Sequence, residues 1–333
     1  MNKTAWGRLQ KFMEEHGFDR FFIYRSENFA WLTGGGDNTV AIGEGTGCLE
    51  VSSDKICLRT SKIEAARLQE EEKAEFEVIT YPWYSSPPIQ RPNDLEADLT
   101  PLRLVLSSAE QERFRGLGRD AAEALGEAMR EAKPEWTEHT LAGAIAAGMY
   151  ERGIQPIVLL VAGEERIFKY RHPLPKDQPL DRLAMAVLCG KRDGLVANLT
   201  RMRSWSYPEV MSRYKRVLEV EKRALDVTVS GVTVGEVMQA IVDGYRAIDA
   251  PHAFDEHHQG GVAGYRPREL LGVPGEKTQL EIGMALAWNP SLPGAKVEDT
   301  FLLTKGGLED LTFDPDWPTV VVAGRSRPTV LAG

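Results

Sequence analysis

The sequence predicts a two-domain α+β protein, on three observations. Residues 1–105 alternate short amphipathic helices with short apolar strands. A proline-rich stretch follows this pattern. The remaining residues contain a pattern that repeats at a fixed offset, which predicts a second domain built from two similar halves. A chain of 333 residues is long enough for two domains.

The first domain begins with an amphipathic helix. Residues 6–17 place Leu9, Phe12 and Met13 on one face, as a helix packed on a sheet requires. A second helix is predicted over residues 61–72. Short apolar or alternating stretches predict the strands, which are expected at residues 21–24, near Val40, and at residues 48–51, 56–58 and 76–81.

The boundary between the domains is predicted near residue 105. Four prolines (Pro82, Pro87, Pro88 and Pro92) mark the preceding stretch as a linker. The predicted domains are therefore residues 1–105 and 106–333. A long helix is expected over residues 107–132, because Ser108 can cap its N-terminus and Glu110 lies in its first turn.

An internal repeat organises the second domain. Five positions match at an offset of 96 residues, four of them identical and one conservative: Thr137, Leu141, Ala144, Ile145 and Gly148 match Thr233, Val237, Ala240, Ile241 and Gly244. Each block follows a long charged helical pattern and precedes strand-like segments. Two halves related by a pseudo-twofold axis would place Thr137 and Thr233 at equivalent positions. The alternative is a chance similarity between two amphipathic helices.

Charge and hydropathy exclude several classes of partner. The net charge of −9, without a basic cluster, argues against nucleic-acid binding. No apolar run approaches the length of a membrane span, and the first residues lack the apolar core of a signal peptide. Cys48, Cys57 and Cys189 have no metal-ligand spacing and are expected to be buried thiols. These features predict a cytoplasmic protein with neither nucleic-acid nor membrane partners.

Four motifs in the second domain resemble one family. They are DGLVANLTR at residues 193–201, QGGVAGYRPRE at 259–269, WNP at 288–290 and KVEDT at 296–300. Their order and spacing resemble the creatinase, prolidase and aminopeptidase P family of peptidase clan M24. The resemblance implies a creatinase-like N-terminal domain, a pita-bread C-terminal domain and a homodimer.

The same resemblance implies that the family's metal site is dismantled. The family holds two metal ions with two Asp, one His and two Glu. Those positions fall on Val187, Asn198, Gly261, Asn289 and Glu298, so only Glu298 keeps its ligand. One carboxylate does not hold two divalent cations. The sequence therefore predicts neither metal nor other cofactor.

His172 and Glu298 are the candidate catalytic residues. His172 resembles the family's substrate-side histidine, and in metal-free creatinase a histidine at that place transfers the proton. A histidine with a near-neutral pKa suits such chemistry. The alternative is a surface-loop histidine among prolines.

The candidate substrate-binding residues are Arg268, His258, Arg201 and Glu269. Arg268 takes the place of the family's second histidine and can bind a carboxylate with two hydrogen bonds. We expect it to face Glu298, with His172 at the rim, although Arg268, Glu269 and Glu298 could instead form a structural ion-pair cluster. His257 and His258 are expected on a strand with opposite orientations, His258 facing the site. The resemblance gives Arg201 a supporting role.

Three functions remain open from the sequence. The first is a metal-independent hydrolase or lyase of the creatinase type, acting on a small polar substrate. The second is an Xaa-Pro aminopeptidase-like protein with a degenerate metal site, acting on short peptides. The third is a pita-bread module that binds without catalysis.

Overall fold

The computed structural model describes residues 1–41, 44–72 and 76–333. The chain divides into two compact units. The first comprises Met1–Glu110 with Arg192–Leu195, and the second comprises Gln111–Lys191 with Val196–Gly333. The predicted boundary at residue 105 lies just before this division. Helices and sheets occur in both units, which confirms the expected α+β class.

The first unit is built on a four-stranded sheet with the order β1-β4-β5-β6. Its strands are β1 (Arg20–Ile23), β4 (Gly47–Ser52), β5 (Ile56–Ser61) and β6 (Glu77–Tyr81), and a small ribbon pairs β2 (Thr39–Ala41) with β3 (Glu44–Gly45). Its helices are α1 (Lys3–His16), α2 (Ser26–Thr33), α3 (Ala65–Glu70) and α4 (Thr100–Arg103). The strands expected from alternation are thereby confirmed.

Two helices of this unit differ from the expectation. The helix expected over residues 61–72 is only α3, because Ser61 still pairs within the sheet. Residues 26–33 form α2, which no sequence pattern above predicts. Its six most C-terminal residues are all buried, so the helix lacks the polar face on which periodicity depends.

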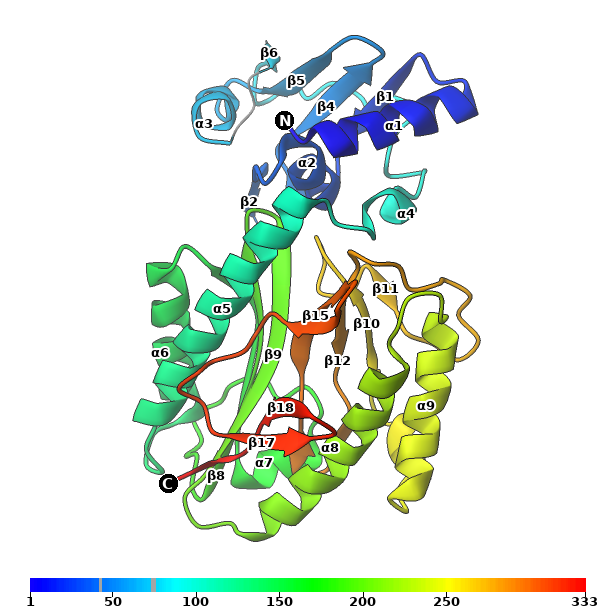
Figure 1. The fold of residues 1–333 in the computed structure, drawn as a ribbon. Coiled ribbons are helices and arrows are strands. Elements are labelled where there is room, and N and C mark those ends of the chain that lie inside the picture. The colour runs from blue at the N-terminus through cyan, green and yellow to red at the C-terminus, as the bar shows by residue number, and fades with distance from the viewer. Residues whose placement is uncertain (42–43, 73–75) are drawn as a thin grey trace. The chain divides into compact units, whose positions relative to one another are not determined.

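The first half of the second unit packs two helices beside a four-stranded sheet with the order β19-β9-β8-β7 (Figure 1). The fourth strand of this sheet, β19 (Leu331–Ala332), comes from the C-terminal end of the chain and pairs with β9. It contains α5 (Ser108–Glu131), α6 (Glu138–Glu151), β7 (Gln155–Gly163), α7 (Glu164–Lys169), β8 (Leu183–Arg192) and β9 (Leu195–Ser204). Ser107 caps α5, because its hydroxyl oxygen accepts from the Glu110 backbone and the Glu110 carboxylate accepts from the Ser107 N–H. The expected long helix is thus present, with its cap one residue before Ser108.

The second half repeats this plan with α8 and α9 on the side of β10 and β12 (Figure 1). Its helices are α8 (Glu209–Val227), α9 (Val234–Ala247) and the short 3-10 helix η1 (Pro251–Phe254). Its main sheet has the order β11-β10-β12-β15-β16, formed by β10 (Gly260–Ala263), β11 (Leu270–Leu271), β12 (Ala285–Trp288), β15 (Asp299–Thr304) and β16 (Gly307–Asp310). The remaining strands are β13 (Ser291–Leu292), β14 (Ala295–Lys296), β17 (Thr319–Val322), β18 (Arg325–Pro328) and β19 (Leu331–Ala332).

Thr137 and Thr233 occupy equivalent positions, as the repeat predicts. Thr137 is the N-cap of α6 and Thr233 the N-cap of α9, and each hydroxyl accepts from a backbone N–H three residues later. Each also forms an isolated bridge to the segment entering a central strand, Thr137 to Pro179 and Thr233 to Gln279. The 96-residue offset is therefore structural, and the chance-similarity alternative is wrong.

The two halves meet where β9 lies beside the start of β15. Thr200 N–H donates to the Glu298 carbonyl at 2.9 Å, and Asn198 N–H donates to the Thr300 hydroxyl at 2.8 Å. The central strands β8 and β12 are buried along nearly their whole length. These strands form part of the core of the second unit.

Two further sequence expectations concern the whole chain. Cys48, Cys57 and Cys189 are all buried free thiols, as expected. No helix within the described residues combines the length and the apolar character needed to cross a bilayer.

Candidate functional site

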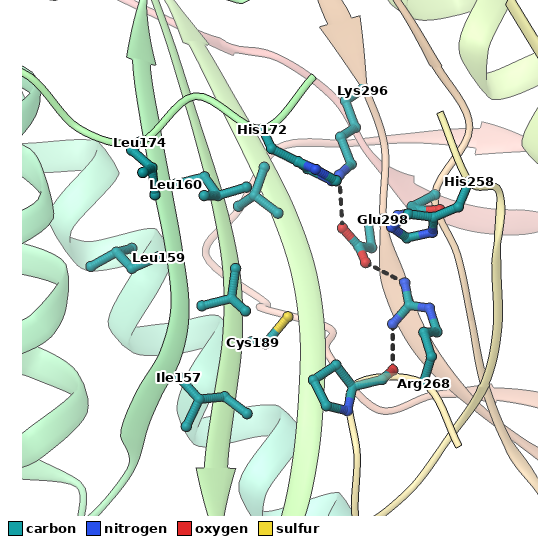
Figure 2. A pocket seen from close by; sticks show the side chains of 14 residues that line it. Ile157, Leu159, Leu160, His172, Leu174, Cys189, His258, Arg268, Lys296 and Glu298 are labelled. Atoms are coloured by element: carbon teal, nitrogen blue, oxygen red, sulfur yellow. Dashed lines mark hydrogen bonds and ion pairs between the residues drawn. The ribbon is translucent and has the colours of Figure 1, made fainter. Parts of the chain in front are cut away.

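A cavity of about 470 Å³ lies in the second unit. Figure 2 shows that one side of this cavity is apolar and the other is polar. One is apolar and comes from β7, β8 and the loop after α7, with Ile157, Val158, Leu159, Leu160, Leu174, Val187 and Cys189. The other bears the polar groups, namely His172, His258, Arg268, Asn289, Lys296 and Glu298, together with Pro267. An apolar cavity with a few convergent polar groups is the usual form of a small-molecule site.

Glu298 is the centre of a buried ion cluster. Its Oε1 accepts from Arg268 Nη2 at 2.7 Å, and its Oε2 accepts from the Thr200 hydroxyl at 3.0 Å. Lys296 Nζ lies 3.4 Å from the same Oε2. The side chains of Glu298, Lys296 and Arg268 are only 3%, 5% and 11% exposed. The expected pairing of Arg268 with Glu298 is present, and Lys296 adds a second cation.

These contacts keep the carboxylate ionised. Burial alone raises the pKa of Glu298, but the charges of Lys296 and Arg268 and the hydrogen bonds from Arg268 and Thr200 lower it to about 2. A carboxyl group that stays ionised at neutral pH is a poor proton donor. Glu298 therefore acts as an anchor for two cations rather than as a general acid.

Three histidines gather beside this cluster. His172 Nε2 and His257 Nε2 are 3.0 Å apart, so one of these nitrogens donates to the other. The rings of His257 and His258 stack, with centroids 4.4 Å apart. The expectation of opposite orientations is therefore wrong, because both residues lie in a bend before β10 and not on a strand.

All three imidazoles are neutral at physiological pH. Burial and the charge of Lys296 lower the pKa of His172 and bring that of His257 to about 2. Burial and the charges of Arg268 and Lys296 lower the pKa of His258 to about 4. A neutral imidazole can accept a proton, which leaves His172 chemically suited to act as a base. Cys189 is no nucleophile, because burial raises the pKa of its thiol to about 12.

The residues at the positions to which the resemblance assigns the metal ligands do not fit a two-metal centre. Val187 has no donor atom, and Asn198 and Asn289 offer only neutral amide oxygens. A Cβ on Gly261 would lie 2.0 Å from the Leu270 carbonyl oxygen, so the backbone leaves no room for a ligand side chain there. The one carboxylate, that of Glu298, is already paired with two cations.

Nitrogen atoms of His172, His257 and His258 lie within 4.8 Å of one another and form, within the described residues, a group that could hold a metal ion. The same positive charges that lower the pKa of these imidazoles also oppose a bound cation. The diglycine at residues 260–261 allows close backbone packing against β11 and β12. This is the structural explanation for the diglycine and requires no ligand.

Two predicted binding residues lie outside the cavity lining. Arg201 is buried and donates to Asp299 Oδ1 at 2.9 Å and to the Thr312 carbonyl at 2.8 Å. Glu269 accepts from the Tyr265 backbone N–H at 2.9 Å. Both positions support the surrounding fold, so their geometry offers no contact with a ligand in the cavity.

Sequence reasoning missed two residues of the site. Lys296 precedes Glu298 by two positions, and such residues share a face in extended chain, which is the signal that could have found it. His257 was expected to point away from the site. The apolar side of the cavity was also missed, because an apolar β7 reads like any core strand.

Comparison with known proteins identifies the family of this chain. The sequence model of Metallopeptidase family M24 matches residues 112–305, and that of the Creatinase/Prolidase N-terminal domain matches residues 6–133. The chain belongs to metallopeptidase family M24. No protein of curated function matches it.

Solved structures with the same fold confirm the expected creatinase-like and pita-bread architecture. The chain is similar to the prolidase from Pyrococcus furiosus, with a TM-score of 0.76 and 21% identity over 92% of this chain and 99% of that one. The Xaa-Pro dipeptidase from Bacillus anthracis matches with 0.77 and 16% over 99% of both chains. The X-Pro aminopeptidase from Thermotoga maritima matches with 0.78 and 18% over 98% and 99%. This M24 chain therefore has the fold of these solved structures.

Proposed function

We propose that this M24 protein binds a small carboxylate-bearing molecule and acts on it without the family's two-metal centre, as a metal-independent hydrolase or lyase. The observation that carries the proposal is the pair of buried cations, Arg268 and Lys296, around the single carboxylate of Glu298. The cavity lining thus has one positive charge in excess. An anionic ligand group would restore neutrality, and its attraction to the two cations would offset its cost of desolvation.

Arg268 and Lys296 are the proposed carboxylate-binding groups, and Glu298 holds them in place. Arg268 already uses Nη2 on Glu298 and Nη1 on the Pro267 carbonyl. Its Nε lies buried without a hydrogen-bond partner. A guanidinium anchored in this way is pre-organised, so binding costs little side-chain entropy.

His172 is the proposed proton-transfer residue. In the tautomer where His172 Nε2–H donates to His257 Nε2, His172 Nδ1 has a free lone pair. Protonation of Nδ1 gives an imidazolium that the bond to His257 stabilises. This proton could come from a water that attacks the substrate, or from a carbon acid in a lyase reaction.

The test is turnover by protein treated with a chelator. We expect the protein to turn over small amides that carry a free carboxylate, either by hydrolysis with release of the amine or by elimination. The variant His172→Gln should abolish the reaction while the ligand still binds. Activity that appears only when Mn²⁺, Co²⁺ or Zn²⁺ is added would contradict the proposal. Ligand binding without any turnover would support the non-catalytic module in its place.

Xaa-Pro peptides are a second candidate, since the chain is similar to prolidases and Xaa-Pro dipeptidases. A short peptide ending in proline brings a carboxylate and an apolar ring, which the two sides of the cavity suit. Release of free proline from Leu-Pro, with and without added Mn²⁺, distinguishes this function. We also propose a homodimer, from the family resemblance, and a cytoplasmic location, from the composition.

A further inference from the structure

The ionised side chains that line the cavity carry a net positive charge. Arg268 and Lys296 contribute two positive charges and Glu298 one negative charge. The other titratable groups in the lining are uncharged at neutral pH. Their pKa values are shifted toward the neutral form, downward for His172 and His258 and upward for Cys189.

The carboxylate of Glu298 is already paired with two cations. Oε1 accepts from Arg268, and Oε2 accepts from Thr200 and also lies next to Lys296 Nζ. A ligand ammonium in the cavity would therefore be desolvated without an anionic partner and would lie near two cations. Both effects disfavour binding.

The opposite side of the cavity requires an apolar substituent. Leu160 and Leu174 lie on the side of the cavity opposite the ion cluster (Figure 2). Burial of a branched aliphatic group against these residues is favourable in proportion to the apolar area removed from water.

From these three features we infer that the site selects monoanionic carboxylic acids with an apolar substituent, whose nitrogen is acylated or absent. It rejects zwitterionic amino acids and peptides with a free amino terminus, and Lys296 is the residue that imposes the discrimination. This inference rests on the proposed function, narrows its substrate class and excludes the second candidate, the free Xaa-Pro peptides.

The test compares three ligands with a related carbon skeleton by isothermal titration calorimetry at pH 7.5. N-acetyl-leucine and 4-methylpentanoate are monoanions, and leucine is a zwitterion. We expect both monoanions to bind at least about tenfold more tightly than leucine, a difference of about 1.4 kcal/mol. Equal binding of leucine would overturn the inference and leave the proposed carboxylate site intact. Failure of all three to bind would overturn both.

The variant Lys296→Met tests the assigned cause. It removes the excess charge and keeps the length of the side chain, so the ratio of the affinities for N-acetyl-leucine and leucine should fall below about threefold. Lys169→Met is the control, because Lys169 is exposed, pairs with Glu165 and lies outside the cavity lining. The control should keep the wild-type ratio. An unchanged ratio in a folded Lys296→Met protein would contradict the role of Lys296, and Lys296→Gln repeats the test if the methionine variant does not fold.

Discussion

The buried carboxylate of Glu298 stays ionised because two cations, Arg268 and Lys296, lie beside it. The family resemblance gives this position to one of five metal ligands, and two side-chain cations, Arg268 and Lys296, lie beside its carboxylate. This pairing is consistent with electrostatics, because a buried carboxylate without a cationic partner is strongly unfavourable.

The histidine cluster predicts a loss of stability on mild acidification. His257 is only 7% exposed, and its pKa in the folded protein is about 2, against 6.5 in the unfolded chain. Below pH 6.5 the unfolded state binds the extra proton, so the free energy of unfolding falls as the pH falls. The expected slope from this residue is up to about 1.4 kcal/mol per pH unit.

Urea unfolding at pH 7.5, 6.5, 5.5 and 4.5 measures this slope. His257→Gln should unfold with a shallower pH dependence than wild type over this range, and His139→Gln, an exposed histidine, should not. Glu298 contributes little to the pH dependence of the free energy of unfolding in this range, because its lowered pKa affects stability only below its unfolded value of about 4.5. Identical slopes in the two variants would refute the assignment.

At the scale of elements, β18 attaches the C-terminal segment to the core through one arginine. Arg327 is 1% exposed and donates to Glu221 at 2.6 and 2.9 Å, to Asp299 at 2.6 Å and to Asp310 at 2.7 Å. These acids come from α8, the start of β15 and the end of β16. A single cation therefore holds three elements together.

Removal of this cation should destabilise the protein strongly. Arg327→Met leaves buried carboxylates unpaired and should cost about 3–5 kcal/mol in the free energy of unfolding. Arg325→Met on the same strand is the matched control, since its pair with Asp226 is partly exposed and contributes about 0–1 kcal/mol. Guanidinium denaturation followed by circular dichroism compares the two, and equal losses would show that the network is not what holds β18.

The same scale shows what sequence patterns can and cannot predict. The caps at Thr137 and Thr233 depend on local hydrogen bonds, so a local pattern was sufficient to find the repeat. Arg268 and Glu298 were predictable because an unpaired buried charge needs a partner. The stacked rings of His257 and His258 were not, because a bend of the backbone determines their orientation and has no periodic signature. The ligand-facing surface of β7 was likewise indistinguishable from core.

At the scale of the whole molecule, the residues at the four positions that the resemblance assigns to lost metal ligands predict the metal content. Protein purified without chelator should contain well under one equivalent of Mn, Co or Zn per chain by elemental analysis. The reason is that Val187 and Gly261 have no donor atoms and Glu298 is already paired. Near-stoichiometric metal that is lost together with an activity would refute this account.

The homodimer proposed from family resemblance has a direct test. Light scattering coupled to gel filtration at micromolar concentration should give twice the mass of one chain. The mass of a single chain across a tenfold range of concentration would show the proposal to be wrong.

The central claim is that side-chain cations have replaced the metals as the binders of an anionic ligand. Calorimetric titration of chelator-treated protein with 4-methylpentanoate tests it most directly, with Arg268→Ala as the variant and Arg246→Ala, on the exposed face of α9, as the control. The account predicts the same affinity before and after chelation, unchanged binding in the control and at least about tenfold weaker binding in Arg268→Ala. Binding that requires added metal, or that survives the loss of Arg268, would contradict it.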